Sequence, residues 1–233
     1  SECGNSIPVT LTQLTLSCWV CGQSVTDTRD SKTYTTVLIG TQCWFAQNLN
    51  VGIRINGSVN QTNNSTIEKF CYNDNETNCT TYGGLYQWAE LMNYTTSSDS
   101  NPSGRQGICS TGWHIPADAE FCQMETYLDA TVNCTIEGWL GTDVGGKMKE
   151  TGTTHWLTPN AGATNTSGFT ALPCGIRFSY GGFANLTTNT NFWSATESSS
   201  TNAWQRNLNY NYAQVNRNGN GKANGFSIRC CKD

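Results

Sequence analysis

Twelve cysteines among 233 residues constrain the fold of this chain more than any other feature of its sequence. A large and even number of cysteines is typical of a disulfide framework made in an oxidising compartment. Zinc binding is the alternative, since Cys18 and Cys21 have the Cys-x-x-Cys spacing of metal ligands. The chain has only two histidines and no second pair at that spacing, which favours disulfides. The residues expected to form disulfides are Cys3, Cys18, Cys21, Cys43, Cys71, Cys79, Cys109, Cys122, Cys134, Cys174, Cys230 and Cys231.

Two of these bonds can be predicted from sequence position alone. Cys71 and Cys79 lie on either side of a short polar loop, and Cys122 and Cys134 flank the end of an expected helix. Sequence does not determine how the other cysteines pair. Cross-links at this density are typical of proteins that work outside the cell, which predicts an extracellular or cell-surface location.

The remaining composition indicates a folded chain rather than a disordered one. Charged residues make up only 13%, but eight Trp, nine Tyr and eight Phe supply large side chains for a core. The net charge of -4 and the lack of a basic run argue against nucleic acid and anionic membrane surfaces as partners. No apolar run approaches the roughly 18 residues of a spanning helix, so we expect no membrane insertion. The first residues, Ser1 to Cys3, resemble a mature terminus left by removal of a signal peptide.

The stretch from Gly107 to Asp129 has the pattern of a short extended segment followed by a helix. The residue before a proline avoids helical angles, so the helix is predicted to begin at Pro116 or just after it. Phe121, Met124 and Leu128 then recur at helical spacing. One face of this helix is therefore expected to pack on the core.

This stretch belongs to a set of motifs that carry a family resemblance. Together with Tyr82–Ala89, Phe192–Glu197 and Ser227–Cys230, it resembles the Fibrobacter succinogenes major paralogous domain. The resemblance runs from about Asp30 to the end of the chain. It implies an α+β fold similar to C-type lectins and formylglycine-generating enzymes, disulfide-rich, with small antiparallel sheets and long irregular loops. The two short helices of such a fold are expected over 85–92 and from Pro116 onward.

The resemblance also bears on one disulfide and on location. It implies a bond between Cys109 and one of the last cysteines, either Cys230 or Cys231. The family occurs in secreted and surface proteins, mostly bacterial, and its biochemical role is poorly defined. The resemblance therefore implies much about fold and little about activity.

Residues 1–29 are expected to be an N-terminal extension, and residues 30–233 the family domain. Within the extension, Pro8–Cys18 is rich in Thr, Val and Leu, with the alternation of a strand interrupted once. This strand is either an edge strand of the chain's own sheet or one donated to a neighbouring subunit. Repeated donation from head to tail would generate a filament, because such a contact need not close. The residues predicted to mediate self-association are Val9, Leu11, Leu14 and Leu16.

Two other segments have strand patterns. Thr33–Leu49 predicts two short strands that turn at Gly40. Near the end of the chain, alternate residues from Trp204 to Tyr212 share one face, and Asn218–Gly221 has the composition of a hairpin turn. Phe226 is expected on the returning strand. Such an aromatic stripe is typical of a core, although an exposed one would stack on sugar rings.

No set of residues predicts catalysis. His114 and His155 each lie beside a tryptophan and are expected to be structural, and no Gly-x-Ser-x-Gly motif indicates a serine nucleophile. Glu150 and Glu197 are acidic candidates for glycoside hydrolysis only because they lie near aromatic residues. The Glu-Pro-Asn and Trp-Asn-Asp motifs of calcium-dependent lectins are missing. We therefore expect no catalytic residue, no cofactor and no metal.

Acceptor triplets for N-glycosylation are numerous, although composition alone explains most of them. If the chain is glycosylated, we expect Asn60, Asn93, Asn165 and Asn185 to be modified first. The triplets recognised here begin at Asn60, Asn63, Asn64, Asn75, Asn78, Asn93, Asn133, Asn165 and Asn185.

Together these patterns predict a secreted or cell-surface structural or adhesive protein. It is expected to self-assemble into an extracellular filament or array through its N-terminal strand, so its main partners are copies of itself, in a homo-oligomer or polymer. The alternative is a calcium-independent carbohydrate-binding module that holds glycans with exposed aromatic residues.

Overall fold

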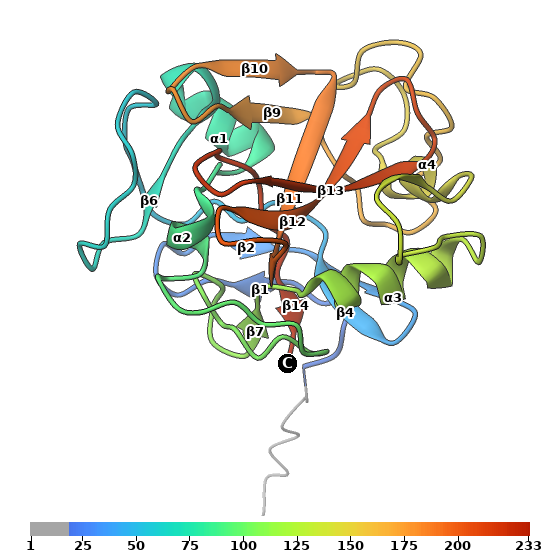
Figure 1. Cartoon of the computed structure of the whole chain (residues 1–233), viewed down its shortest axis with the longest axis horizontal. Coiled ribbons are helices and arrows are strands. Elements are labelled where there is room, and N and C mark those ends of the chain that lie inside the picture. The colour runs from blue at the N-terminus through green and yellow to red at the C-terminus, as the bar shows by residue number, and fades with distance from the viewer. Residues whose placement is uncertain (1–18) are drawn as a thin grey trace, which may run out of the picture.

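A computed structural model describes residues 19–233. Over this range, four α-helices and several small sheets alternate with long irregular segments (Figure 1), which confirms the predicted α+β class. The C-type-lectin-like topology remains a prediction. None of the described helices is long and apolar enough to cross a bilayer. The residues predicted for self-association, Val9, Leu11, Leu14 and Leu16, lie outside the described residues together with Cys3 and Cys18.

The largest sheet has six strands in the order β10-β9-β11-β12-β13-β8, and its long strand β11 runs through the middle of the molecule in Figure 1. Neighbouring strands are antiparallel except β11 and β9, which are parallel. The strands are β8 (Gly138–Leu140), β9 (Cys174–Arg177), β10 (Phe183–Leu186), β11 (Asn189–Glu197), β12 (Asn202–Asn209) and β13 (Val215–Gly221).

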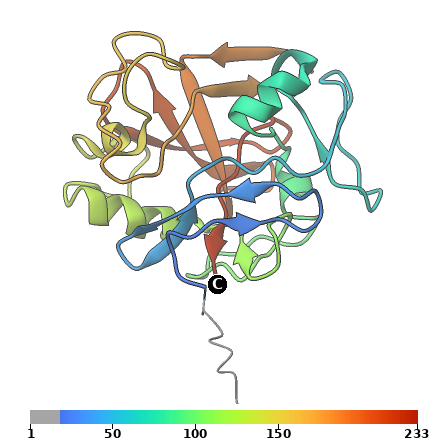
Figure 2. The same ribbon diagram turned by 180° about the vertical axis from the view of Figure 1, so that it is seen from behind.

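A second, antiparallel sheet has four strands in the order β3-β4-β14-β7. The first two strands form the predicted hairpin at Gly40, with Ile39 opposite Gln42. Two further sheets have two strands each, β1 with β2 and β5 with β6; Figure 2 shows the first of these in front of the molecule. The strands are β1 (Val25–Thr26), β2 (Thr33–Tyr34), β3 (Thr36–Ile39), β4 (Gln42–Phe45), β5 (Ile53–Arg54), β6 (Glu68–Lys69), β7 (Trp113–His114) and β14 (Cys231–Lys232).

Two strands separate two hydrophobic cores. Phe192 and Trp193 are consecutive on β11, yet they belong to different buried clusters, because successive side chains of a strand point to opposite faces. Trp44 and Phe45, consecutive on β4, likewise belong to different buried clusters. All four side chains are fully buried. Both faces of these strands are therefore packed, which explains why the sequence shows apolar pairs there rather than simple alternation.

Helix α3 (Asp118–Leu128) begins two residues after Pro116, as predicted. Phe121 and Met124 are completely buried on the core side. The Glu120 carboxylate accepts a hydrogen bond from the Ala117 N–H, which satisfies one of the free donors at the helix start. The amphipathic pattern of this segment therefore predicted both the type and the position of the element.

The expectation of two helices was wrong, because the described chain has three other α-helices and one 3-10 turn. Asn75 caps the first of them by accepting the Thr77 N–H, so the segment between Cys71 and Cys79 contains a helix start rather than only a polar loop. The helix expected over 85–92 is confined to its second half. These elements are η1 (Tyr72–Asp74), α1 (Glu76–Tyr82), α2 (Trp88–Leu91) and α4 (Val144–Met148).

Asn218–Gly221 was predicted as a hairpin turn but lies inside strand β13. Its register is regular, with Trp204 of β12 opposite Gly219. A Cβ on Gly219 would lie 2.6 Å from Ser198 Oγ, so a larger residue would require this hydroxyl to move, and the glycine does not turn the chain. The turn itself lies between β12 and β13, around Tyr212.

Four disulfides join described residues, and three of them connect residues that the sequence pointed to. Cys71–Cys79 and Cys122–Cys134 match the pairs expected from position, and Cys109–Cys230 is one of the two bonds implied by the family resemblance. The fourth bond, Cys21–Cys43, was not assigned in advance.

Cys174 and Cys231 were expected in disulfides too, but both are free and buried. Cys231 follows Cys230 directly, so the alternation of a strand turns its thiol to the other core, away from Cys109. The even number of cysteines in the sequence therefore did not mean that every one is bonded.

Three buried cations hold the irregular segments together. Lys149, Arg177 and Arg229 are each at most 1% exposed, and none forms an ion pair with a described carboxylate. Lys149 Nζ instead donates to three main-chain carbonyl oxygens at 2.9 to 3.0 Å. The two arginines likewise donate to main-chain oxygens of separate loops. Loop carbonyls that lack a sheet or helix partner thus gain a charged donor.

Candidate functional site

Strand β3 is an open edge of the four-stranded sheet. It pairs with β4 on one side, and no other strand of the described chain pairs with it on the other. Its residues are Thr-Val-Leu-Ile, and the Leu38 side chain is 59% exposed. Natural proteins usually protect an edge with a charge, a proline, a bulge or a covering segment. β3 has no charge, proline or bulge, so it is suited to accept an added strand.

The edges of the six-stranded sheet are better protected. In β10, Asn185 has a φ of 66° and is missing from the pairs with β9, so this edge is locally irregular although its register is unchanged. The opposite edge, β8, has only three residues and begins at Gly138, whose φ is 101°. β3 is therefore the most regular open edge among these strands.

The first described residues run across the same sheet. The Trp19 ring contacts the Trp113 ring of β7 edge-on, with centroids 5.5 Å apart, and Cys21 is bonded to Cys43 of β4. The Gly22 N–H then donates to Thr36 Oγ1 of β3 at 2.9 Å. In Figures 1 and 2 the coloured chain begins beside the C-terminal end. Trp19, at which the described chain begins, therefore lies beside β7, and β3 is the other edge strand of this sheet.

A pocket with a volume of about 480 Å³ lies on another part of the surface. The end of α1, the β2 strand, the segment 46–50 and Arg229 line it. This volume falls within the range of about 300–1,000 Å³ that is usual for small-molecule sites. Unlike most such sites, its walls are rich in hydroxyl and amide groups, which include Thr33, Gln47, Thr80 and Thr81.

Arg229 is the buried charge of this pocket. Its Nε donates to Asn48 Oδ1 at 2.6 Å, and its two terminal nitrogens donate to the main-chain oxygens of Phe45, Phe169 and Thr170. Burial lowers the pKa of Arg229 to about 9, which leaves the guanidinium charged at neutral pH. All four acceptors are neutral, so no described carboxylate compensates this charge.

Glu150 also lines the pocket and is held by a histidine. His155 Nδ1 lies 2.9 Å from both carboxylate oxygens of Glu150, and the Tyr82 ring contacts the imidazole edge-on. Glu197 lines a different, smaller pocket and pairs with Lys222 instead. The two glutamates named from the sequence are thus not brought together as an acid pair.

A comparison with protein families identifies the domain that carries both features. Residues 37–232 match the Fibrobacter succinogenes major domain. The chain belongs to this family. The matched range begins within β3 and ends in β14, so it includes most of the open edge and most of the pocket, but not the pocket residues 32–34. No curated protein and no solved structure matches the chain closely enough to add an activity or a fold.

Within this Fibrobacter domain, His114 links three segments. Its Nε2 lies 2.7 Å from Glu120 Oε1 and its Nδ1 lies 2.8 Å from Asp233 Oδ1. Burial opposes the protonated ring, but the hydrogen bonds and charges of Glu120 and Asp233 outweigh it and raise the pKa of His114. The histidine therefore connects β7, α3 and the last residue of the chain, in keeping with the structural role expected for it.

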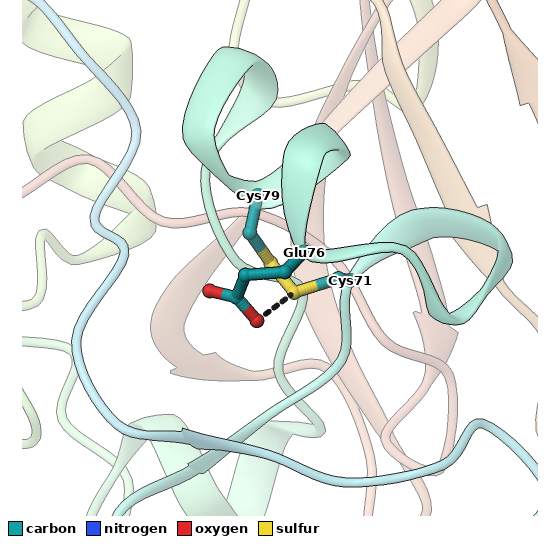
Figure 3. A group of neighbouring side chains, drawn as sticks. All are labelled: Cys71, Glu76 and Cys79. Carbon is teal, nitrogen blue, oxygen red and sulfur yellow. Dashed lines mark hydrogen bonds between the residues drawn. A yellow bond between two sulfur atoms is a disulfide. The ribbon is translucent and has the colours of Figure 1, made fainter.

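Two groups of side chains in the domain have metal-ligating atoms, and neither fits a metal. His114, Glu120 and Cys231 are all buried and close together, but the first two hydrogen-bond directly to each other and burial raises the pKa of the Cys231 thiol, whereas a metal binds the thiolate. In the other group, shown in Figure 3, Cys71 and Cys79 are joined by a disulfide beside Glu76. A disulfide has no thiolate to bind a metal.

The free thiols are also poorly placed for chemistry. Cys174 Sγ lies 2.9 Å from Thr190 Oγ1 and 3.0 Å from Ser227 Oγ, in a fully buried position. Burial raises the pKa of the Cys174 thiol above its usual value, and burial likewise raises that of Cys231. Because the thiolate is the reactive form, both residues are expected to be inert packing groups.

The glycosylation triplets differ in how free their acceptor nitrogens are. Asn93 and Asn185 are exposed, and neither side chain makes a hydrogen bond to a described residue. Asn60 is exposed too, although its Oδ1 accepts two hydrogen bonds. Asn165 is only partly exposed and its Nδ2 donates to a threonine. Asn56 is exposed, is followed by Gly and Ser, and begins a further triplet that was not among those predicted.

Proposed function

We propose that this family member is an extracellular or cell-surface structural or adhesive protein that polymerises through its N-terminal extension and does not act as an enzyme. The observation that carries the proposal is the open, uncharged edge of β3 with the exposed Leu38. A segment with strand pattern, Pro8–Cys18, is available in the same chain to pair with it. Pairing of this kind uses main-chain hydrogen bonds for affinity and alternate side chains for specificity.

The placement of the two partners favours a polymer over a closed dimer. Trp19 of the extension contacts β7, and the acceptor edge is β3. The donor segment and the acceptor edge are therefore different surfaces of one subunit, and pairing between them is a heterologous contact. Such contacts generate open filaments unless a rotation happens to close them into a ring.

Other features support a durable, non-catalytic role. Four disulfides are compatible with an oxidising environment outside the cell. Both histidines are engaged by glutamates, and both free thiols are buried. These histidine and cysteine side chains of the described chain are thus used for internal contacts, as expected of a long-lived structural protein rather than an enzyme.

Two complementary substitutions test the proposal by sedimentation velocity over a range of concentrations. Leu38→Asp blocks the acceptor edge, and Leu11→Asp blocks the donor segment. The wild-type chain is expected to form concentration-dependent polymers, and each variant alone to stay monomeric. An equimolar mixture of the two is expected to form dimers only, because one intact donor then meets one intact acceptor.

Leu157→Asp is the matched control, since Leu157 is also an exposed leucine, at 47%, and lies outside β3. This variant is expected to polymerise like the wild type. The proposal fails if the wild-type chain is monomeric throughout, or if Leu38→Asp polymerises as the control does.

Carbohydrate binding by exposed aromatics is the second candidate, favoured by two stacked pairs near the surface. Tyr180 is 78% exposed and stacks on Phe178, and Tyr212 is 42% exposed and stacks on Trp139. A ring fixed in this way offers a flat face on which a sugar can stack. Glycan-array binding that is lost in Tyr180→Ser or Tyr212→Ser would support this candidate, and binding unchanged in both would count against it.

A further inference from the structure

The pocket beside α1 is unusual in leaving a buried charge without a counter-charge. Arg206 shows what the chain does elsewhere: this arginine is equally buried, and Glu125 and Asp118 each accept a hydrogen bond from it at 2.6 Å. Arg229 has no such partner. Lys149 and Arg177 also lack one, but neither lines the pocket. An uncompensated charge at the wall of a cavity favours an anionic ligand over a neutral one.

Arg229 also retains hydrogen-bonding capacity. A guanidinium has five N–H donors, and the four hydrogen bonds to Asn48, Phe45, Phe169 and Thr170 use one each. One N–H of Nη2 therefore has no acceptor among the described residues. A carboxylate oxygen is a suitable acceptor, because a hydrogen bond between two charged groups is stronger than one between neutral groups.

A second cation lies in the same wall. The Lys32 side chain is 38% exposed, and its Nζ lies 3.2 Å from Asp30 Oδ2. Glu150 supplies the only carboxylate among the lining residues, against the charges of Lys32 and Arg229. The lining residues by themselves thus carry one net positive charge, and because Asp30 pairs with Lys32, Arg229 is the cation of the pocket without a described carboxylate partner.

The uncharged part of the lining indicates what the rest of the ligand is like. Threonine hydroxyls and the side-chain amide of Gln47 can both donate and accept, which suits the hydroxyl groups of a sugar. Tyr82 adds a half-buried aromatic ring to the wall, and its hydroxyl has no hydrogen-bond partner among the described residues. An aliphatic carboxylate would leave these polar groups unused.

The geometry points to a binding site for an acidic monosaccharide of the uronic acid class, with its carboxylate toward Arg229 and Lys32 and its hydroxyls toward the threonine and amide wall. This sugar is either a free molecule or the terminal residue of a polysaccharide. The inference does not rest on self-association, because every lining residue belongs to one chain and none lies in β3.

Isothermal titration calorimetry of the full chain with D-glucuronate tests the site, with D-glucose and acetate as the neutral and the ring-free probes. Saturable binding of glucuronate is expected, at least tenfold tighter than binding of either other probe. An oligosaccharide that ends in glucuronate distinguishes the two sources: tighter binding than the monosaccharide indicates a polysaccharide end, and equal binding a free sugar.

Substitutions of charge then locate the site. Lys32→Gln is expected to weaken glucuronate binding by about two- to fivefold, the usual size for a partly exposed ion pair. Glu150→Gln is expected to strengthen it by a similar factor, because it removes the only acidic group of the lining. Lys222→Gln removes the same charge outside the pocket and is expected to change nothing.

The inference is overturned if glucuronate binds no better than glucose, or if Lys32→Gln and Lys222→Gln behave alike. It is also overturned if acetate binds as well as glucuronate, because the polar wall then plays no part. Leu38→Asp is expected to bind glucuronate like the wild type. This last measurement separates failure of the pocket from failure of the polymerisation proposal.

Discussion

At the scale of single residues, His114 is the clearest case of a side chain that holds separate segments together. It is 1% exposed and lies between Glu120 at the start of α3 and Asp233, the last residue. Its raised pKa means that the imidazole binds a proton more tightly in the folded chain than in the unfolded chain. The stability that His114 contributes is therefore complete below the unfolded pKa of about 6.5 and is lost as pH rises through the folded value.

Nuclear magnetic resonance of the imidazole protons can test this account, because the chain has only one other histidine, His155, and the two signals can be told apart. Asp233→Asn removes one of the two carboxylates from an exposed position, so the fold should be kept. The pKa of His114 is expected to lie above 6.5 in the wild type and to fall in this variant. Asp143→Asn, a similarly exposed acid that pairs with Lys147, is the control and should leave the titration of His114 unchanged. Titration of His114 below its ordinary value would contradict the account.

At the scale of elements, glycines are found where another segment of main chain lies close to a helix. The glycine pair of α4 permits two other segments to touch the helix. A Cβ on Gly145 would lie 2.1 Å from the Gln214 oxygen, and one on Gly146 would lie 2.1 Å from the Gly162 oxygen. The pair beside Lys147 is thus a packing feature, in agreement with its mismatch to a phosphate-binding loop.

Gly146→Ala is expected to destabilise the domain by about 1–3 kcal/mol, because the main chain that it meets must shift. Gly221→Ala is the matched control in β13: the nearest atom to its added Cβ is 3.7 Å away, so little change is expected. Urea denaturation with the disulfides intact measures both. Equal stability of the two variants would show that α4 does not need its glycines.

The sequence predicted local features better than distant ones. The helix after Pro116, the hairpin at Gly40 and the bond Cys71–Cys79 each depend on residues close in sequence. The prediction of a turn at Asn218–Gly221 was wrong, because the composition of this segment suits a turn whereas its conformation is set by pairing with β12. The Cys21–Cys43 bond depends on how the extension crosses the second sheet, and no local sequence pattern predicts this.

The candidate site was even less predictable from sequence. Arg229 was noticed only as part of a family motif, and its lack of a carboxylate partner is a property of the folded chain. The open edge of β3 could not be predicted either, because the sequence predicts a hairpin but not which of its two strands is the edge strand of the sheet. The donated segment, in contrast, was predicted from alternation alone and remains a prediction.

At the scale of the whole molecule, cross-links replace much of the regular structure. Cys109–Cys230 closes a loop of 121 residues, whereas Cys71–Cys79 closes one of 8. The buried arginines and Lys149 add links between loops that have no strand or helix of their own. Large irregular regions can thus be kept in place without a continuous sheet.

Removing each of these disulfides should have a different effect. All four cysteines are completely buried, so paired alanine substitutions leave similar cavities. The loss of loop closure in the unfolded chain predicts a cost of about 5 kcal/mol for Cys109–Cys230 and about 2.5 kcal/mol for Cys71–Cys79. Urea denaturation of the two variants provides the comparison, with the midpoints fitted to one common m value. A larger cost for the short loop would mean that strain or packing, rather than chain entropy, dominates.

Cryo-electron microscopy of the assembled protein tests the central claim most directly, since it shows what lies against β3. The account predicts filaments in which residues 8–18 of one subunit pair with Thr36–Ile39 of the next. A field of single particles, or filaments in which the edge of β3 remains uncovered, would contradict it.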